Sequence, residues 1–164
     1  MILLSHLSYP VLAFLLLAKL FGISYSNADL VLLMAFSVLP DLDFFYHALK
    51  RGGWQDYTLK HHKWASHWPI VYSPLIIAAL IYPDRLITIA CTAVYFHLFL
   101  DTFASGDGIM WFYPFSKKFY NFFSEGYRNK HGKAWFRTYL KRRLYKIDLL
   151  SYTTALIILA RALR

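Results

Sequence analysis

Residues 86–101 read LITIACTAVYFHLFLD, a run of apolar side chains with no Asp, Glu, Lys or Arg until Asp101 ends it. A bilayer-spanning helix takes about 20 residues, or ~17 at the low end, so this run alone also fits a buried helix of a soluble protein. Four further apolar runs accompany it, at Met1–Ala18, Leu30–Leu39 (preceded by Gly22–Ala28), Trp68–Pro83 and Leu149–Ala160. Because five such runs in one small chain could hardly bury one another without lipid, the sequence predicts an all-α, small multi-helix integral membrane protein with about four or five membrane helices.

The composition agrees with a membrane protein that has a basic aqueous face. Apolar residues make up 58% of the 164 residues and charged residues 16%, against roughly 45–50% and 25% in soluble domains. Lys and Arg outnumber Asp and Glu by 18 to 9, for a net charge of +9. Such hydrophobicity argues against intrinsic disorder and against a soluble DNA-binding domain. The single cysteine, Cys91, excludes an intrachain disulfide and a Cys-rich zinc finger.

The first apolar run has two interpretations, a retained membrane helix and a cleaved signal peptide. A signal peptide carries basic residues before its apolar run, whereas here the first one, Lys19, follows it. We therefore expect a retained helix. The chain shows no internal repeat, low-complexity tract or flexible linker, so residues 1–164 are expected to form one membrane-embedded domain.

The distribution of Lys and Arg predicts the topology. The connections at 19–29 and 84–85 carry one basic residue each, the loop at 41–67 carries four, and the segment at 102–147 carries ten. The positive-inside rule places the two basic stretches on the cytoplasmic side. With an odd number of spans the N-terminus lies inside and the C-terminus outside. Arg161 and Arg164 argue against that, which leaves open a last helix lying in the membrane interface.

The segment Thr102–Ile147 interleaves its ten basic residues with aromatic ones, including Trp111, Phe112 and Phe115. This composition predicts an interfacial segment lying on the anionic leaflet, with membrane lipids and their anionic headgroups as partners. Basic residues interleaved with aromatic ones also bind single-stranded nucleic acid. We do not expect nucleic acid as a partner, because basic runs beside membrane helices are commonplace.

Polar residues gather at the ends of the predicted helices, all on one membrane face. Histidines and aspartates open the first and third helices and close the second and fourth: His6, Asp41, Asp43, His62, His67, His97 and Asp101. Ionisable groups at such positions are costly and by default mark function. The sequence therefore predicts a metal site at the cytoplasmic face. A single histidine in an apolar helix would more simply be a hydrogen-bonded core residue.

The local spacing suits metal binding. His97 and Asp101 are four apart and share one helix face. Asp41 and Asp43 follow Pro40, which predicts an irregular turn free to bind or bridge metals. With Ser66 as a cap and Pro69 in the first turn, His67 is expected to begin the third helix and His62 to lie in the loop before it.

Imidazole and carboxylate ligands without thiolates suit a divalent metal with open positions. Zinc is expected first, with manganese or iron as alternatives, and the number of ions stays open. Such an ion lowers the pKa of water towards neutrality and makes it a nucleophile. A second-shell or acid–base role for one carboxylate is equally compatible. His47 could join the site if its stretch is helical, and His61 could replace His62.

The order of these motifs resembles the membrane-bound metal-dependent hydrolase family typified by the bacterial YdjM inner-membrane proteins. That family shows an early His, a Leu-Pro-Asp-x-Asp turn, a His-Arg-Gly-x-Thr-His segment, a His-x-x-x-Asp helix end and a Gly-rich turn leading to Trp-Pro. The matching segments are His6, Leu39–Asp43, His62–His67, His97–Asp101 and Gly106–Phe115. In the middle segment Lys63-Trp64 replaces Arg-Gly and Ser66 replaces Thr, a departure that bears on the substrate more than on the metal.

The family is in turn similar to zinc-dependent phospholipase C, which implies phosphodiester hydrolysis at a lipid surface. The resemblance implies a metal-dependent hydrolase of the inner membrane that cleaves a phosphoester of a lipid or related amphiphile. Within the predicted metal set, Asp41, Asp43 and His62 are the expected catalytic residues, and Lys63 and Ser66 the expected substrate-binding ones. A rival interpretation is a non-catalytic membrane protein in which a metal clamps helix ends and the basic segment binds anionic lipid or a partner.

Overall fold

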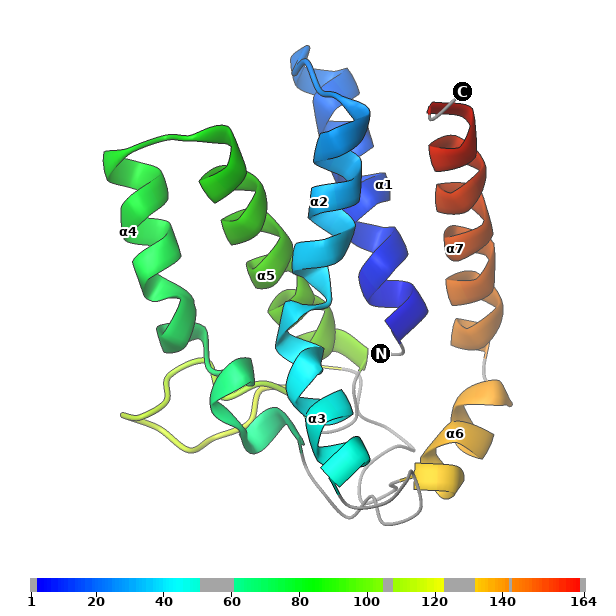
Figure 1. Ribbon diagram of the computed structural model, residues 1–164. Coiled ribbons are helices and arrows are strands. Elements are labelled where there is room, and N and C mark those ends of the chain that lie inside the picture. Colours follow the sequence, from blue (N-terminus) through cyan, green and yellow to red (C-terminus); the bar gives the residue numbers. More distant parts are fainter. Residues whose placement is uncertain (1–2, 51–60, 105–107, 123–131, 142, 163–164) are drawn as a thin grey trace.

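The fold consists of helices, the longer of which run alternately towards the two ends of the molecule (Figure 1). The computed structural model describes residues 3–50, 61–104, 108–122, 132–141 and 143–162. The helices are α1 (Leu3–Phe21), α2 (Asn27–Ser37), α3 (Leu42–Lys50), α4 (Ser73–Ile81), α5 (Arg85–Ala104), α6 (Gly132–Leu140) and α7 (Arg143–Ala162). Short 3-10 turns lie at Leu39–Asp41, His61–Lys63, Ala65–His67 and Pro69–Tyr72. The all-helical class expected from the sequence is confirmed.

The centre of the bundle is formed by α1, α2 and α5, with α7 against α1 and α4 against α5. Its apolar core consists of Val11, Leu30, Leu33, Ile89 and Ala93, all buried. A bidentate ion pair between Asp29 of α2 and Arg85 of α5 fastens the end of the bundle that lies uppermost in Figure 1. Ser26 and Asp29 also form a capping box at the start of α2. An ion pair and a helix cap thus stabilise this end of the bundle.

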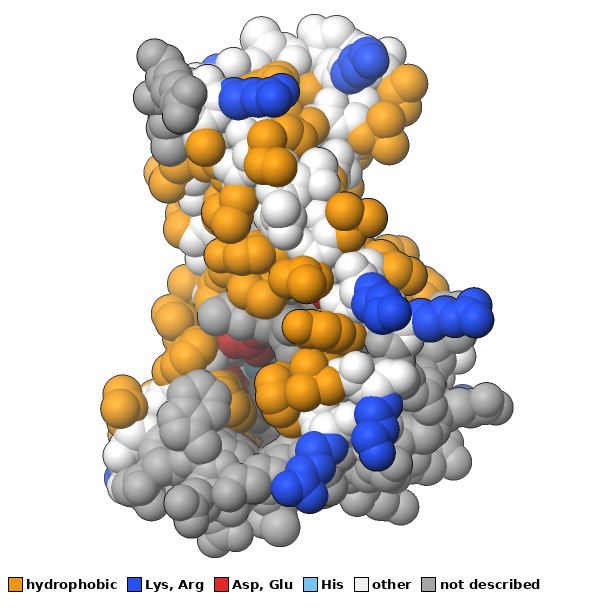
Figure 2. All heavy atoms as spheres, turned by 90° about the vertical axis from the view of Figure 1, so that its right-hand side faces the viewer, with side chains coloured by type: hydrophobic (Ala, Val, Ile, Leu, Met, Phe, Trp, Pro, Cys, Tyr) orange, Lys and Arg blue, Asp and Glu red, His pale blue; other side chains and the backbone are white. Residues whose placement is uncertain are grey.

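Two helices are long and apolar enough to cross a membrane, at Leu4–Phe21 and Arg85–Phe103. A shorter apolar stretch lies at Pro69–Ile81. No residue of α4 is buried, and Leu80 and Ile81 are each 79% exposed, as suits a lipid-facing helix. In Figure 2, a stretch without Lys or Arg separates the blue side chains near the top from those in the lower half. The count of four or five spans stays a prediction.

The third predicted helix begins later than the sequence suggested. The helix was expected to start at His67 with Ser66 as its cap, but α4 starts at Ser73, after the 3-10 turn Pro69–Tyr72. Trp68 is the reason: it precedes Pro69 and has extended backbone angles (φ −95°, ψ 118°), which a helix cannot continue through. His67 therefore ends a separate 3-10 turn, whereas His62 lies before it in another turn, outside any α-helix, as predicted.

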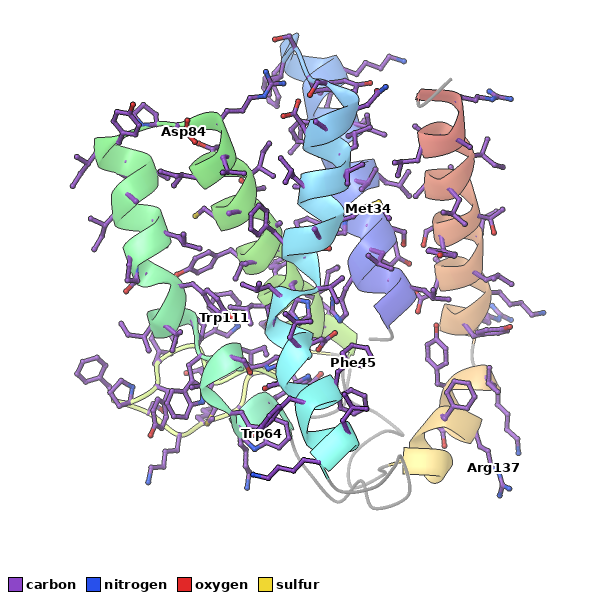
Figure 3. All side chains as sticks on the ribbon, viewed as in Figure 1. Met34, Phe45, Trp64, Asp84, Trp111 and Arg137 are labelled. Atoms are coloured by element: carbon purple, nitrogen blue, oxygen red, sulfur yellow. The ribbon has the colours of Figure 1, made fainter. Side chains whose placement is uncertain are left out.

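The polar stretches contain helices that the sequence interpretation left out. Asp41 lies in a 3-10 turn, but Asp43 lies in the first turn of α3 rather than on an irregular turn. Part of the basic segment forms α6. Its ends at 102–104 and 143–147 belong to α5 and α7. Residues 108–122 of the segment form a loop, whose Ile109 and Tyr120 pair as an antiparallel bridge. In Figure 3, Asp84 is labelled at the start of α5, and Trp111 of this loop lies between the lower parts of α4 and α5.

A buried polar contact joins α1 to α6 and α7. The Asp148 carboxylate on α7 is fully buried and accepts hydrogen bonds from the hydroxyls of Tyr9 (2.9 Å) and Tyr139 (2.5 Å). One turn further along α7, the hydroxyl of Ser151 lies 3.0 Å from the hydroxyl of Ser8, the residue before Tyr9. The two tyrosines satisfy a carboxylate that would otherwise be costly to bury. This contact holds α7 against the helix that carries His6.

Candidate metal centre

Histidines and aspartates from distant parts of the chain meet at the lower end of the bundle in Figure 1, where α1 begins and α2 and α5 end. His6 comes from the first turns of α1, and His97 and Asp101 from the last turns of α5. Asp41, His62 and His67 come from 3-10 turns. The four imidazoles are buried, each at most 3% exposed. Six of the seven predicted ligands therefore form one largely buried cluster.

Asp101 lies at the centre of this cluster. Its Oδ1 is 3.3 Å from Nε2 of His6, and its Oδ2 is 3.1 Å from Nε2 of His97 and 3.4 Å from Nε2 of His62. Nε2 of His67 lies 3.9 Å from the same Oδ2. One carboxylate, 1% exposed, thus faces four imidazole nitrogens.

Asp41 closes the other side of the cluster. Its Oδ1 lies 3.5 Å from Nε2 of His67 and 3.7 Å from Nε2 of His97. The rings themselves are stacked or tilted against one another, with centroids 3.8 Å apart for His6 and His97 and 4.8 Å apart for His62 and His67. Asp41 and Asp101 therefore contact overlapping sets of imidazoles.

Backbone carbonyls set the orientation of two of the rings. Nδ1 of His97 is 2.7 Å from the carbonyl oxygen of Ser37, and Nδ1 of His62 is 3.1 Å from that of Gly108. A carbonyl oxygen can only accept, so each Nδ1 carries the proton and donates it. In a neutral ring the lone pair is then on Nε2, which points at Asp101. Neutral imidazole with its lone pair turned inward is the form that binds a metal.

The helix ends explain why these acceptors are available. Ser37 is the last residue of α2, and the last carbonyls of a helix have no partner within it. Pro40 prevents α2 from continuing, because it lacks the N–H that the next helical hydrogen bond needs. Nδ1 of His97 on α5 donates to the Ser37 carbonyl oxygen instead.

The second acceptor, the Gly108 carbonyl, belongs to a turn rather than to a helix end. Gly108 has φ +80°, a left-handed conformation that glycine adopts without strain.

The separations among the donor atoms fit a bound cation. Nε2 of His97 makes no hydrogen bond to any residue that the structure describes, although Oδ2 of Asp101 is only 3.1 Å away. A lone pair facing a carboxylate oxygen at that distance calls for a positive charge between them, either a metal ion or a second proton on the ring. Neighbouring ligands of a bound divalent ion lie about 3.0–3.6 Å apart, as the closest of these donor atoms do.

Two groups of donors could each hold an ion. His6, Asp41 and His97 form one group, and His62, His67 and Asp101 form the other. Within each group the donor atoms lie within 4.8 Å of one another. Asp101 contacts His6 and His97 of the first group as well, so the two groups share one carboxylate.

Asp43 is the predicted ligand that the structure does not bring into either group. It lies on the other side of His67, with Oδ2 at 3.7 Å from Nδ1 of that ring. The Ser66 hydroxyl donates to the same Oδ2 and lies 3.0 Å from Nδ1 of His67. Carboxylates in such positions orient a metal-binding histidine from behind. The structure therefore gives Asp43 and Ser66 the geometry of groups that position His67.

The charges of the cluster favour ionised carboxylates. Burial raises the pKa of Asp41, but His97, His67 and His6 lower it more, so it lies well below its usual range. Burial lowers the pKa of His67, but hydrogen bonds to Asp41 and Asp43 and the charge of Asp101 raise it to about 9. At neutral pH the His67 ring is thus protonated on both nitrogens, and positively charged, in the metal-free protein. A metal that binds its Nε2 must displace the proton from that nitrogen.

Access to the cluster lies on the side of the aspartates. The side chains of Asp41 and Asp43 are 15% and 16% exposed, whereas His67 and His97 are fully buried. Figure 2 shows a hollow on the side of the molecule that carries α6 and α7, in which acidic side chains are visible between apolar ones. The cluster is therefore buried except on the side of Asp41 and Asp43, which solvent can reach.

Three further residues singled out in the sequence have different outcomes. Lys63, predicted to bind substrate, is exposed. The stretch around His47 is helical, as its joining the site would require, but the side chains of His47 and His61 lie outside the described part of the structure. Whether either is a ligand stays open.

Sequence reasoning missed the two carbonyl acceptors. The carbonyl of Ser37 has no side-chain signal, because any residue at the last position of the helix would supply it. Gly108 had a weak signal, since a glycine just before an aromatic run often marks a turn with positive φ. The burial of His62 against that turn could not be foreseen from spacing.

Replacing Gly108 with Ala is expected to weaken metal binding about 10–100-fold, the range for losing the partner of a metal-binding histidine. A Cβ there would lie 2.2 Å from the Tyr120 carbonyl oxygen, so the turn must move and take the acceptor of His62 with it. Zinc titration of the purified protein measures the change. Gly22→Ala is the matched control: φ is also positive (+66°), but the Cβ meets open space far from the cluster. Equal zinc affinity in the two variants would contradict the role of Gly108.

The comparisons with known proteins agree with this geometry. The family model described as YdjM inner membrane protein matches residues 1–163, which is nearly the whole chain. No curated protein and no solved structure matches the chain significantly. The chain, a helical bundle with two candidate spans and buried histidine–aspartate groups that could hold a metal ion, thus belongs to the YdjM inner membrane protein family.

Proposed function

We propose that this protein is a membrane-bound metal-dependent hydrolase that cleaves a phosphoester of a lipid or related amphiphile. The observation that carries the proposal is the lone pair of His97, held inward by the Ser37 carbonyl and aimed at the buried Asp101 carboxylate. Membership of the family supports the reaction class. Zinc is the proposed metal, with manganese or iron as alternatives, because the donors are imidazole and carboxylate without thiolate.

The residues divide into those that hold the metal and those that position them. His6, His62, His67 and His97, with Asp41 and Asp101, would hold one or two ions. When bound, a divalent ion supplies a water activated for attack and stabilises negative charge on the phosphoryl group. Asp43 and Ser66 would orient His67, a narrower role than the metal ligation and substrate binding expected from the sequence. Catalytic roles for Asp41, Asp43 and His62 stay predictions.

The amphiphile is favoured as substrate by where the cluster lies. It is buried at one end of apolar helices, beside the ends of both candidate spans. A phosphate at the headgroup level can reach such a site while the acyl chain stays in lipid. We place this end at the cytoplasmic face, because ten of the eighteen basic residues belong to the segment at 102–147. Four or five spans are part of the same proposal.

Headgroup or phosphate release from phospholipid vesicles tests the activity. Purified protein reconstituted with zinc is expected to release it, a chelator to abolish the release, and added zinc to restore it. His97→Ala should be inactive. If the wild type binds zinc through these residues but releases no phosphate or headgroup from any phospholipid or soluble phosphodiester, the metal only clamps the helix ends and the hydrolase proposal is wrong.

A further inference from the structure

The loop at 108–122, here called the aromatic loop, projects sideways from the bundle below the lower end of α4 (Figure 1). Its tip carries apolar side chains that nothing described covers: Phe115 is 92% exposed and Phe112 58%. Phe115 is the most exposed of the large apolar side chains in the described part of the chain. Lys117 and Lys118, two and three residues after Phe115, are also exposed.

The root of the loop is held firmly. Backbone hydrogen bonds run from Ile109 N to Tyr120 O (3.0 Å) and from Tyr120 N to Ile109 O (2.9 Å). The indole of Trp111 donates to the hydroxyl of Thr102 on α5 (2.8 Å), and Ile109 packs in an apolar cluster with residues of that helix. The exposed tip is therefore presented by a fixed scaffold.

The side of the loop next to α4 is fixed as well. Tyr113 stacks on Trp68, with ring centroids 3.8 Å apart. The 3-10 turn that leads into α4 continues the apolar surface, since Ile70 and Val71 are 45% and 46% exposed. The exposed apolar groups thus extend from the loop to the start of α4, a helix in which no residue is buried.

We propose that the aromatic loop inserts Phe112 and Phe115 into the boundary between headgroups and acyl chains of the surrounding bilayer, while Lys117 and Lys118 bind anionic headgroups. The loop starts within five residues of the end of α5, a candidate span, and so lies at the level where that span leaves the membrane. Aromatic rings favour this interface, and lysines beside it attract anionic lipid. Phe115 suits the apolar side of this interface, together with the exposed apolar residues at the start of α4. Lys117 and Lys118 suit its anionic side.

The same loop touches the metal cluster, because the Gly108 carbonyl at its root accepts from His62. Lipid bound along the loop would therefore lie close to the cluster. The insertion itself does not depend on metal binding or hydrolysis. Loss of either activity would leave this inference intact, and the experiment below measures neither.

A fluorescent probe at the tip tests the insertion. Cys91, the only cysteine, is replaced with serine, and an environment-sensitive fluorophore is attached to Phe115→Cys in the full chain. The protein is reconstituted into vesicles of phosphatidylcholine with or without phosphatidylglycerol. Spin-labelled lipids then quench a probe in the bilayer, and aqueous iodide quenches a probe in water. Leu49→Cys on α3 is the matched control, an 84% exposed apolar residue near the same end of the bundle.

The probe at position 115 is expected to be quenched by spin-labelled lipid and protected from iodide, with the reverse pattern at position 49. Spin-labelled phosphatidylglycerol should associate with the tip in preference to phosphatidylcholine. That preference should fall about fivefold for each lysine replaced with serine at 117 and 118, the equivalent of about 1 kcal/mol each. Iodide quenching at 115 as strong as at 49 would overturn the inference. So would protection from both quenchers, which would show that a protein surface covers the tip.

Discussion

Asp101→Asn is expected to lower zinc affinity more than 100-fold, beyond the range for changing a second-shell partner, and to reduce hydrolysis to background. The substitution keeps the size of the side chain but removes the negative charge that faces four buried imidazoles. Both candidate metal groups lose a shared carboxylate. Zinc titration and headgroup release measure the two effects separately.

The control is Asp84→Asn, the same chemical change at the opposite end of the same helix. Asp84 caps α5 by accepting from the backbone N–H of Leu86 at 2.8 Å, and Asn serves equally well as a helix cap. Zinc affinity and hydrolysis should therefore match the wild type. If Asp101→Asn also keeps wild-type zinc affinity, Asp101 is not the centre of a metal site.

Asp148→Ala is expected to destabilise the protein by about 2–5 kcal/mol, because the buried Tyr139 hydroxyl and the half-buried Tyr9 hydroxyl lose this acceptor at once. Tyr9 and Tyr139 both donate to this carboxylate, which is fully buried. For a chain of this length the melting temperature should fall by about 5–15 °C. Thermal unfolding in detergent, followed by tryptophan fluorescence, measures the shift.

Asp148→Asn should lie between the wild type and Asp148→Ala, because the amide keeps one acceptor oxygen. Thr153→Ala on the same helix is the control, since Thr153 is exposed and its hydroxyl bonds only within the helix. It should change the melting temperature little. Equal melting temperatures for Asp148→Ala and Thr153→Ala would show that the contact between α1 and α7 does not depend on this carboxylate.

The end of the molecule where the site lies could be predicted from sequence, because it depends only on where helices begin and end. An ionisable residue at the edge of an apolar run lies at a membrane face, whatever the details of packing. Counting Lys and Arg then placed His6, Asp41 and Asp101 on the same face. The structure brings these three within one cluster.

The details between the helices could not be predicted in the same way. Whether Ser66 caps a helix or bonds to Asp43 depends on how the chain passes Trp68, and Pro69 has two compatible effects there. It favours a first helical turn, and it also forces the residue before it to be extended. In this chain the second effect decides the local structure: Trp68 is extended, and α4 starts only at Ser73.

Asp148 shows a different limit. From the sequence alone, Asp148 is a charged residue beside the last apolar run, as expected at a helix end. In the structure its side chain is fully buried against Tyr9 and Tyr139. Partners 139 and 9 residues away in the chain leave no trace in local spacing. Amphipathic α3 and α6 were missed because the helices were predicted from continuous apolar runs, which these two short helices lack, although their helical period is clear.

The metal content of the purified protein tests the central claim most directly. After incubation with zinc and dialysis, mass spectrometry of the metals should find at least one ion bound per chain in the wild type, and two if both groups fill. His97→Ala should retain far less, and Asp84→Asn as much as the wild type. Negligible zinc in the wild type, or the same content in His97→Ala, would contradict a metal centre built on these histidines and aspartates.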